Sequence, residues 1–232
     1  MLFLIINLFI EKDMVIKNYL CCASLFVVFG FSCTKENKKV VPETKQKSEI
    51  ILQEKPRVEI NYSNYYQEAK QYCQRNNLNQ NKFILIDLGV HSGLKRFFVF
   101  DFKQNKISKS YIVSHGCGDN RWGATMSKEK APISNEFDSH CSSIGKFVVL
   151  DRGVSQWGIK VNYILQGKDK SNSNARSRAI VLHSWDAISD NEVYPNGTPE
   201  GWGCPAVSNE SMKEIDEILK QNKKVLMWII KT

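Results

Sequence analysis

Short runs of β-branched and aromatic residues recur along the chain from residue 83 onward, and turn-forming residues separate them. Such runs are typical of β-strands, because branched and aromatic side chains pack well on a pleated sheet. The segment Lys103-Gln104-Asn105-Lys106 is one of the separating turns. The pattern predicts seven strands, at residues 83–88, 96–102, 106–113, 144–150, 158–165, 178–183 and 225–230.

Two segments repeat apolar side chains at the spacing of a helix. Residues 209–221 show this most clearly, and Ser208 or Asn209 can cap the helix. Residues 61–76 predict a second helix that packs on the domain. Together these elements predict a mainly β fold with attached helices (α+β), in the form of a β sandwich within one domain.

The first 33 residues predict a targeting segment. Met14 is a second possible start, Lys17 gives a basic beginning, and an apolar run at residues 20–31 leads to Cys33. This run is short for a membrane span and resembles a bacterial lipoprotein signal, in which Cys33 becomes the acylated first residue. An uncleaved membrane anchor is the alternative. Both interpretations predict that the remaining chain is exported.

Residues 34–57 are rich in Lys, Glu, Gln and Asn and have no hydrophobic period. Such composition is typical of a flexible tether, which would span at most about 80 Å and more typically about 25 to 30 Å. The sequence therefore predicts a signal segment at 1–33, a charged tether at 34–57 and a catalytic domain at 58–232.

The chain has 232 residues, with 32 Lys and Arg against 24 Asp and Glu, for a net charge of +8. Residues 1–33 hold two lysines and two acidic residues, so their removal leaves this balance unchanged. A basic protein suits a polyanionic envelope or a carboxylate-rich peptide. No nucleic-acid-binding motif accompanies the charge, and we expect no nucleic acid partner.

Cys204 lies on a loop between glycines, and His183 ends an upstream apolar strand. Gly201 and Gly203 leave one side of the cysteine open to a substrate carbonyl, as a thiolate nucleophile with an imidazole base requires. Pro205 has no N–H, so an oxyanion hole would use the N–H groups of Gly203, Cys204 or a neighbouring loop. Taken alone, a single Cys and a single His are more often core residues.

Further short motifs precede this loop in a fixed order, and each is weak by itself. They are Ile86-Asp87 with Arg96-Phe97-Phe98-Val99-Phe100-Asp101, then Val113-Ser114-His115-Gly116, then Ile133-Ser134-Asn135 with Ser142-Ser143-Ile144-Gly145, then Asn174-Ala175-Arg176-Ser177-Arg178-Ala179-Ile180-Val181-Leu182-His183, and Gly203-Cys204-Pro205-Ala206-Val207. With these motifs, the chain from about residue 65 resembles the murein L,D-transpeptidase catalytic-domain family, in the subgroup with a Gly-Cys-Pro-Ala loop.

The resemblance implies a β-rich transpeptidase fold, Cys204 as the nucleophile, His183 as the base, and no cofactor. It implies attack on the carbonyl of the third residue of a peptidoglycan stem peptide, release of D-Ala, and transfer of the acyl group to an amine, giving a 3-3 cross-link or protein attachment. The alternatives are an L,D-carboxypeptidase or endopeptidase that uses water, and a catalytically inactive wall-binding lipoprotein. The implied location is the cell envelope, lipid-anchored and facing the periplasm. The oligomeric state stays unknown.

Two features depart from the better-known branch of the superfamily, which has Ser-His-Gly-Cys followed by an arginine. Trp202 stands in place of the histidine, and no arginine follows the nucleophile loop. Arg178, or alternatively Arg176, is therefore expected to bind the stem carboxylate, because a guanidinium pairs with a carboxylate through two hydrogen bonds. Ser143 and Trp202 are the other expected substrate-binding residues.

Ser114-His115-Gly116-Cys117 reproduces the nucleophile motif of the better-known branch. In that branch the cysteine lies near the end of the domain, whereas Cys117 precedes most of the matching motifs. We therefore expect His115 to support the site, together with Gly203 as part of the oxyanion environment.

The sequence also permits a Cys117–Cys141 disulfide, because exposed thiols tend to pair in an oxidising periplasm. His115, Cys117, His140 and Cys141 invite a zinc interpretation as well. Adjacent residues rarely converge on one ion and no Cys-x-x-Cys motif is present, so we expect no metal site.

Overall fold

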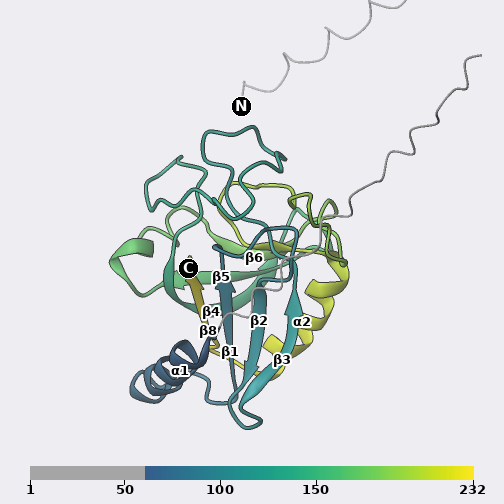
Figure 1. The fold of residues 1–232 in the computed structure, drawn as a ribbon. Coiled ribbons are helices and arrows are strands. Elements are labelled where there is room, and N and C mark those ends of the chain that lie inside the picture. Colours follow the sequence, from purple (N-terminus) through teal and green to yellow (C-terminus); the bar gives the residue numbers. More distant parts are fainter. Residues whose placement is uncertain (1–60) are drawn as a thin grey trace, which may run out of the picture. The chain divides into compact units, whose positions relative to one another are not determined.

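The structure is a computed structural model that describes residues 61–232 (Figure 1). The predicted signal segment with Cys33, and the tether at 34–57, lie outside the described residues. In the part of the chain that is described, no helix has both the length and the apolar character that crossing a bilayer requires.

Residues 61–232 form one continuous sheet of eight strands in the order β3-β2-β1-β8-β4-β5-β6-β7. The pairs β1–β8 and β6–β7 are parallel, and the other neighbours are antiparallel. The elements in chain order are α1 (Ser63–Arg75), β1 (Lys82–Asp87), β2 (Phe97–Asp101), β3 (Lys106–Tyr111), β4 (Gly145–Val154), β5 (Val161–Gly167), a 3-10 turn η1 (Lys170–Asn172), β6 (Val181–Ser184), β7 (Ala206–Val207), α2 (Asn209–Gln221) and β8 (Leu226–Ile230).

The main hydrophobic core lies on one face of this sheet. Phe97 of β2, Phe147 of β4 and Leu182 of β6 all belong to it, so strands from both halves of the sheet fold around the same cluster. Helix α2 completes the core with side chains such as Ile215. Burying each large apolar side chain contributes roughly 1.5 to 3 kcal/mol. The predicted mainly β fold with attached helices is confirmed, and the layers of the sandwich belong to one continuous sheet.

Helix α1 packs on the domain, as predicted, and covers the opposite face of the central strands. Its buried Tyr66 and Ala69 join Phe83 of β1 and Trp228 of β8 in a second cluster. The Tyr66 hydroxyl donates to the carbonyl of Phe102 at 3.0 Å. The central strands are therefore covered on both sides, which explains why they read as continuous hydrophobic runs.

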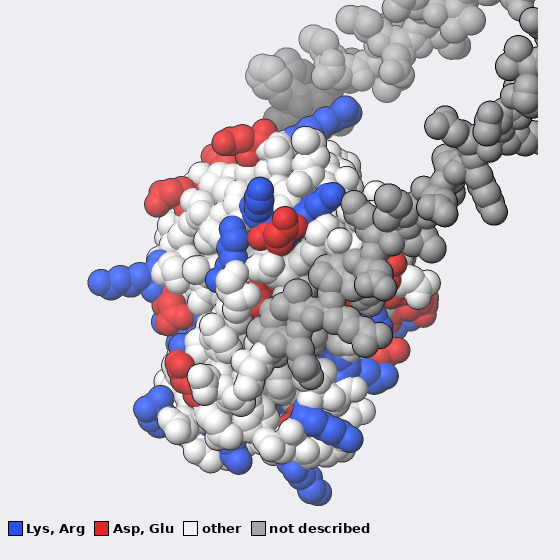
Figure 2. Space-filling view, in the orientation of Figure 1, with Lys and Arg blue, Asp and Glu red and all other residues white. Residues whose placement is uncertain are grey.

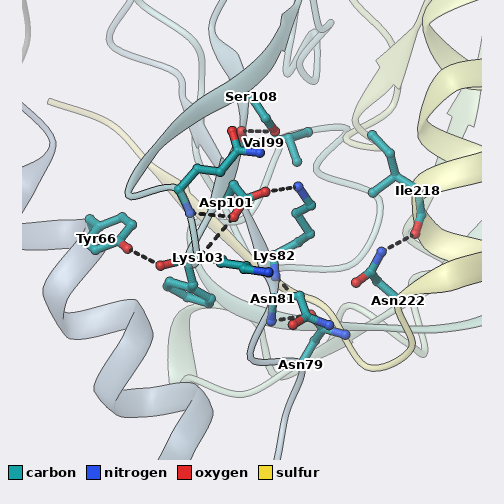
Figure 3. A network of polar contacts seen from close by, with 12 residues as sticks. Tyr66, Asn79, Asn81, Lys82, Val99, Asp101, Lys103, Ser108, Ile218 and Asn222 are labelled. Carbon is teal, nitrogen blue, oxygen red and sulfur yellow. Dashed lines mark hydrogen bonds and ion pairs between the residues drawn. The ribbon is translucent and has the colours of Figure 1, made fainter.

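Polar contacts fix the end of the sheet where β1 begins and β2 ends (Figure 3). Lys82 and Asp101 form an ion pair there. The same carboxylate accepts the backbone N–H groups of Lys103 and Gln104, at 2.9 and 2.8 Å. These bonds hold the tight turn between β2 and β3, which leaves the long loops to the other end of the sheet.

The strand predicted at 178–183 begins later, at Val181. Ala179 has φ +55°, and the N–H of Arg178 donates to Asn174 in a turn of the preceding segment. A left-handed residue interrupts the extended backbone, so the arginine lies in a turn and not in the strand. The strand predicted from Gly158 also starts late, because that glycine has φ +50°.

Figure 2 shows Lys and Arg interspersed with Asp and Glu over one face of the molecule. On this face the excess of positive charge does not gather into a continuous stripe of the kind that follows a phosphate backbone. Charge therefore gives no sign of a polyanion-binding surface there.

Candidate active site

Cys204 and His183 lie on adjacent segments at the β6–β7 edge of the sheet. The parallel register pairs His183 with Ala206, two residues after the cysteine. The His183 N–H points to the carbonyl of Pro205 at 3.4 Å. In Figure 1, long loops gather at this end of the sheet above β6. The fold thus brings together the two residues that the sequence singles out, across about twenty positions of the chain.

The Cys204 thiol is half-buried and accepts a hydrogen bond from the N–H of Val181 at 3.5 Å. Burial raises the pKa of this thiol above its ordinary value, while the Val181 N–H and the charge of Arg178 lower it in part. Desolvation disfavours the thiolate more than these two partners favour it. The thiol is therefore neutral at rest and needs a base.

The His183 ring is oriented by a hydrogen bond from its Nδ1–H to the carbonyl oxygen of Ser184, at 2.9 Å. A carbonyl can only accept, so the proton lies on Nδ1 and Nε2 carries the free lone pair. Burial lowers the pKa of His183, and the Ser184 carbonyl offsets part of that effect. The imidazole is thus neutral and ready to accept a proton.

Gly203 has a backbone that only glycine can adopt at this place. Its φ is +96°, and a Cβ there would lie 2.3 Å from the carbonyl oxygen of Cys141. No pair of such atoms approaches so closely, so both the dihedral angle and the contact require glycine. The nucleophile loop is consequently pressed against the segment 139–143.

Arg178 holds this segment in place. Its Nη2 donates to the Cys141 carbonyl at 2.7 Å, and its Nη1 to the Ser143 hydroxyl at 2.7 Å and the Ser134 carbonyl at 3.1 Å. Ser143 in turn donates to the Ser134 carbonyl. Of the residues expected to bind substrate, the structure therefore places Arg178 and Ser143 in contact behind Gly203. Arg176, the alternative, is exposed.

The backbone around the thiol offers hydrogen-bond donors for an oxyanion. Among the described residues, the N–H groups of Gly203 and Cys204 donate to no acceptor, whereas the N–H of Gly201 donates to the carbonyl of His115 at 2.8 Å. Free donors beside a nucleophile can stabilise the charge that develops on a tetrahedral carbonyl oxygen.

His115 supports the nucleophile loop through its backbone and lies fully buried itself. Its Nδ1 accepts a hydrogen bond from the equally buried Arg96 at 2.7 Å. Desolvation first, and then the charges of Arg96 and Lys231, lower the pKa of His115 to about 2. It is therefore a neutral residue of the interior whose carbonyl anchors Gly201.

Cys117 is also interior, with 1% of its surface exposed. Its N–H donates to the carbonyl of Gly201 at 2.7 Å, and burial raises the pKa of its thiol. Cys141 lies near enough to add to that shift, and all four cysteines of the described residues are free thiols. Among residues 61–232 no group of three or more His, Cys, Asp or Glu could hold a metal ion.

Trp202 is 62% exposed and stacks on His140, with ring centroids 5.2 Å apart. The expected substrate-binding tryptophan thus stands at the open side of the nucleophile loop. Ser142 belongs to one of the sequence motifs but was assigned no role there. Its hydroxyl accepts the N–H of Gly116 at 3.0 Å and donates to the carbonyl of Gly203 at 3.4 Å. Nothing in the local sequence distinguishes this serine from its neighbours.

Gly203→Ala is expected to destabilise the loop by about 1 to 3 kcal/mol and to lower activity strongly, because an alanine must adopt a strained dihedral angle against the Cys141 carbonyl. Gly201→Ala is the matched control, since a Cβ on Gly201 would meet no atom within 4 Å. Thermal unfolding and substrate turnover of both variants test this. Equal unfolding temperatures and equal turnover of the two variants would show that Gly203 is not required for the conformation of the loop.

A comparison with protein-family profiles matches residues 56–228 to the family described as L,D-transpeptidase catalytic domain. The matched region contains both Cys204 and His183. A search of curated protein sequences found no match.

Three solved structures are similar to the chain. The L,D-transpeptidase of Xylanimonas cellulosilytica is 13% identical with a TM-score of 0.39, over 64% of this chain and 60% of that one. Bd1075 of Bdellovibrio bacteriovorus is 15% identical with a TM-score of 0.39, over 67% and 49%. The helical cell shape determining protein Pgp2 of Campylobacter jejuni is 12% identical with a TM-score of 0.38, over 74% and 56%. The chain thus spans less than two thirds of each of these proteins.

Proposed function

We infer the function from the family: the chain belongs to the L,D-transpeptidase catalytic domain family, which supports a role in peptidoglycan modification. We propose that it is a cysteine acyltransferase that acts on peptidoglycan stem peptides and transfers the acyl group to an amine. The observation that carries this proposal is that the fold places Cys204 and His183 on adjacent segments at the β6–β7 edge, with the thiol half-buried and the imidazole oriented by the Ser184 carbonyl.

The first half-reaction forms a thioester. His183 Nε2 takes the proton of the Cys204 thiol, and the sulfur attacks the carbonyl carbon of the third stem residue. The oxygen of the tetrahedral intermediate accepts hydrogen bonds from backbone N–H groups of the nucleophile loop. When the intermediate collapses, the C–N bond to D-Ala breaks, and the leaving amine takes the proton from His183.

The second half-reaction transfers the acyl group. An acceptor amine gives a proton to His183 and attacks the thioester carbonyl. The C–S bond then breaks, and the sulfur of Cys204 leaves and takes the proton back. The product is a new amide bond, either a 3-3 cross-link or an attachment to a protein, and the enzyme returns to its neutral resting pair.

Arg178 has two roles in this proposal. Its hydrogen bonds to Ser143 and to the Cys141 carbonyl support the wall behind Gly203. Its positive charge near the thiol also favours binding of an anionic group, such as the carboxylate of the stem peptide. Trp202, exposed at the open side of the loop, offers a surface for the rest of the peptide.

Mass spectrometry of the full chain incubated with disaccharide tetrapeptides tests the function. Loss of one alanine from each donor stem is expected, together with a cross-linked dimer. Loss of alanine without any dimer would favour the hydrolytic alternative, in which water takes the place of the amine. Neither product, in the presence of an added amine acceptor, would favour the wall-binding lipoprotein.

We propose further that Cys33 carries a lipid anchor and that the catalytic domain faces the periplasm from the envelope. Metabolic labelling with an alkyne fatty acid is expected to label the wild-type protein, and Cys33→Ala is expected to remove the label and shift the protein out of the membrane fraction. Cys22→Ala, a change in another cysteine of the same segment, is the control and should keep both. A label that persists in Cys33→Ala would rule out this anchor.

A further inference from the structure

Three tryptophans from separate parts of the chain form an aromatic cluster. The ring centroids of Trp122 and Trp185 are 4.7 Å apart, those of Trp122 and Trp157 are 5.9 Å apart, and those of Trp157 and Trp185 are 6.3 Å apart. We call these three residues the tryptophan platform. Its members lie on three different loops, so the folded chain alone brings them together.

The platform is open to solvent. Trp122 is 43% exposed and Trp157 is 47% exposed, while Trp185 is 8% exposed and forms the base. Tryptophan is highly buried on average, and large exposed apolar groups that gather in one place mark binding surfaces. Two neighbouring exposed indoles on a buried third one therefore indicate a ligand.

The platform belongs to the same surface as the catalytic residues. Trp185 comes two residues after His183 and packs with Ala206, which is the register partner of His183. Directly opposed residues of paired strands point to one face of the sheet, so this face carries the imidazole as well.

Two hydrogen bonds, each donated by a backbone N–H, hold the loops of Trp122 and Trp157 beside the site. The N–H of Gly123, which follows Trp122, donates to the carbonyl of Glu200 at 2.9 Å, next to the start of the nucleophile loop. The N–H of Ile159, two residues after Trp157, donates to the hydroxyl of Ser184 at 2.9 Å. Both loops are thus tied to the segments that hold Cys204 and His183.

A carboxylate and an amide lie at the edge of the platform. Asp186 follows Trp185 and accepts a hydrogen bond from Asn209 Nδ2 at 2.8 Å. The Oδ1 of the same amide is buried and has no hydrogen-bond partner among the described residues. It lies 2.5 Å from the position that a Cβ would take on Gly158, next to Trp157. The aromatic surface therefore has one exposed polar acceptor beside it, the Asp186 carboxylate.

We propose that the tryptophan platform binds the sugar rings of the glycan strand that carries the stem peptide. A pyranose ring has a face of C–H groups, which stacks on an indole, and hydroxyls around its rim, which donate to a carboxylate such as that of the exposed Asp186. This inference rests on the proposed function, because a stem peptide bound in the active site places its attached sugar next to that site. The platform then selects glycan-attached stems over free peptides.

Calorimetry with the full chain in detergent and an N-acetylglucosamine tetramer tests the site without any catalytic step. The wild-type protein is expected to bind, and Trp157→Ala is expected to weaken binding about tenfold, the effect of losing one stacking surface. Trp157→Phe keeps an aromatic face and should retain most of the affinity. Ile107→Ala is the matched control, because Ile107 is 41% exposed on the edge strand β3 and should leave binding unchanged.

Kinetics with two substrates give a second measurement. Trp157→Ala is expected to lower kcat/KM on the disaccharide tetrapeptide about fivefold or more, mainly through KM, and to leave kcat/KM on the free tetrapeptide unchanged. Trp122→Ala should behave in the same way, so the test does not depend on one variant.

The outcomes separate this inference from the proposed function. Normal turnover with no saccharide binding by the wild-type protein would overturn the platform and leave the transpeptidase function intact. Saccharide binding with no turnover of any stem peptide would overturn the function and keep the platform. A Trp157→Ala variant that loses adsorption to phospholipid vesicles but keeps saccharide affinity would assign the platform to a membrane surface and overturn the inference.

Discussion

Cys204→Ala is expected to lower the turnover of stem peptides by about 10³-fold or more, because removing a nucleophile disables the whole catalytic unit. Substrate binding should survive, since the change removes one sulfur atom from a half-buried position. Release of alanine, followed by mass spectrometry, and the affinity for the same substrate, measured separately, check the two parts of this prediction.

Cys117→Ala is the matched control, since it removes a thiol from the motif that resembles a nucleophile site. Cys117 is 1% exposed and its N–H is bound to Gly201, so its loss should leave most of the turnover. A carbapenem, whose strained ring acylates thiolates, should add one adduct to the wild-type protein on the peptide that carries Cys204. An adduct on Cys117 would reassign the nucleophile and keep the reaction class.

The periodic part of the fold could be predicted from the sequence. The runs of β-branched and aromatic residues located seven of the eight strands. Ser208 or Asn209 was expected to cap α2, and the Ser208 hydroxyl accepts the N–H of Ser211 at 3.1 Å. The two-residue strand β7 was not predicted, because its hydrogen bonds come from β6 and not from its own composition. A strand of two residues has too few positions to show a period.

The conformations of the loops, and the contacts that they make, could not be predicted from the sequence. Arg178 was predicted inside a strand, yet the left-handed Ala179 turns the chain so that the guanidinium meets Ser143 and the Cys141 carbonyl. The sequence gives no sign that Trp122 and Trp157 stack on Trp185, because the contact joins residues up to 63 positions apart. Such contacts depend on tertiary packing, which a local pattern does not contain.

The electrostatics of the site explain why the base matters. Burial raises the pKa of Cys204 and lowers the pKa of His183, so the resting site holds a thiol and an imidazole, not an ion pair. Proton transfer between them must then be driven by the developing oxyanion. Catalysis by a neutral thiol needs the imidazole to remove its proton, whereas a cysteine that is already a thiolate depends less on a base.

His183→Ala is accordingly expected to lower turnover about 10³-fold at neutral pH, comparably to loss of the nucleophile. The variant should regain activity as the pH rises toward and beyond about 8.5, the ordinary thiol pKa, because hydroxide then ionises Cys204 directly. Because burial raises the pKa of the Cys204 thiol, this recovery of activity is expected at still higher pH. Imidazole added to the buffer should restore part of the activity by occupying the space of the missing ring.

The wild-type activity is expected to rise with pH over a lower range than that of the variant. The wild-type activity falls only when the pH drops through the lowered pKa of His183, below about 6.5, the ordinary histidine value, because protonated imidazole cannot accept the thiol proton. Steady-state kinetics of both proteins from pH 5 to 10 test this prediction. A wild-type rate that rises steadily through pH 9, in parallel with the variant, would show that Cys204 ionises without help from His183 and would remove the histidine from the mechanism.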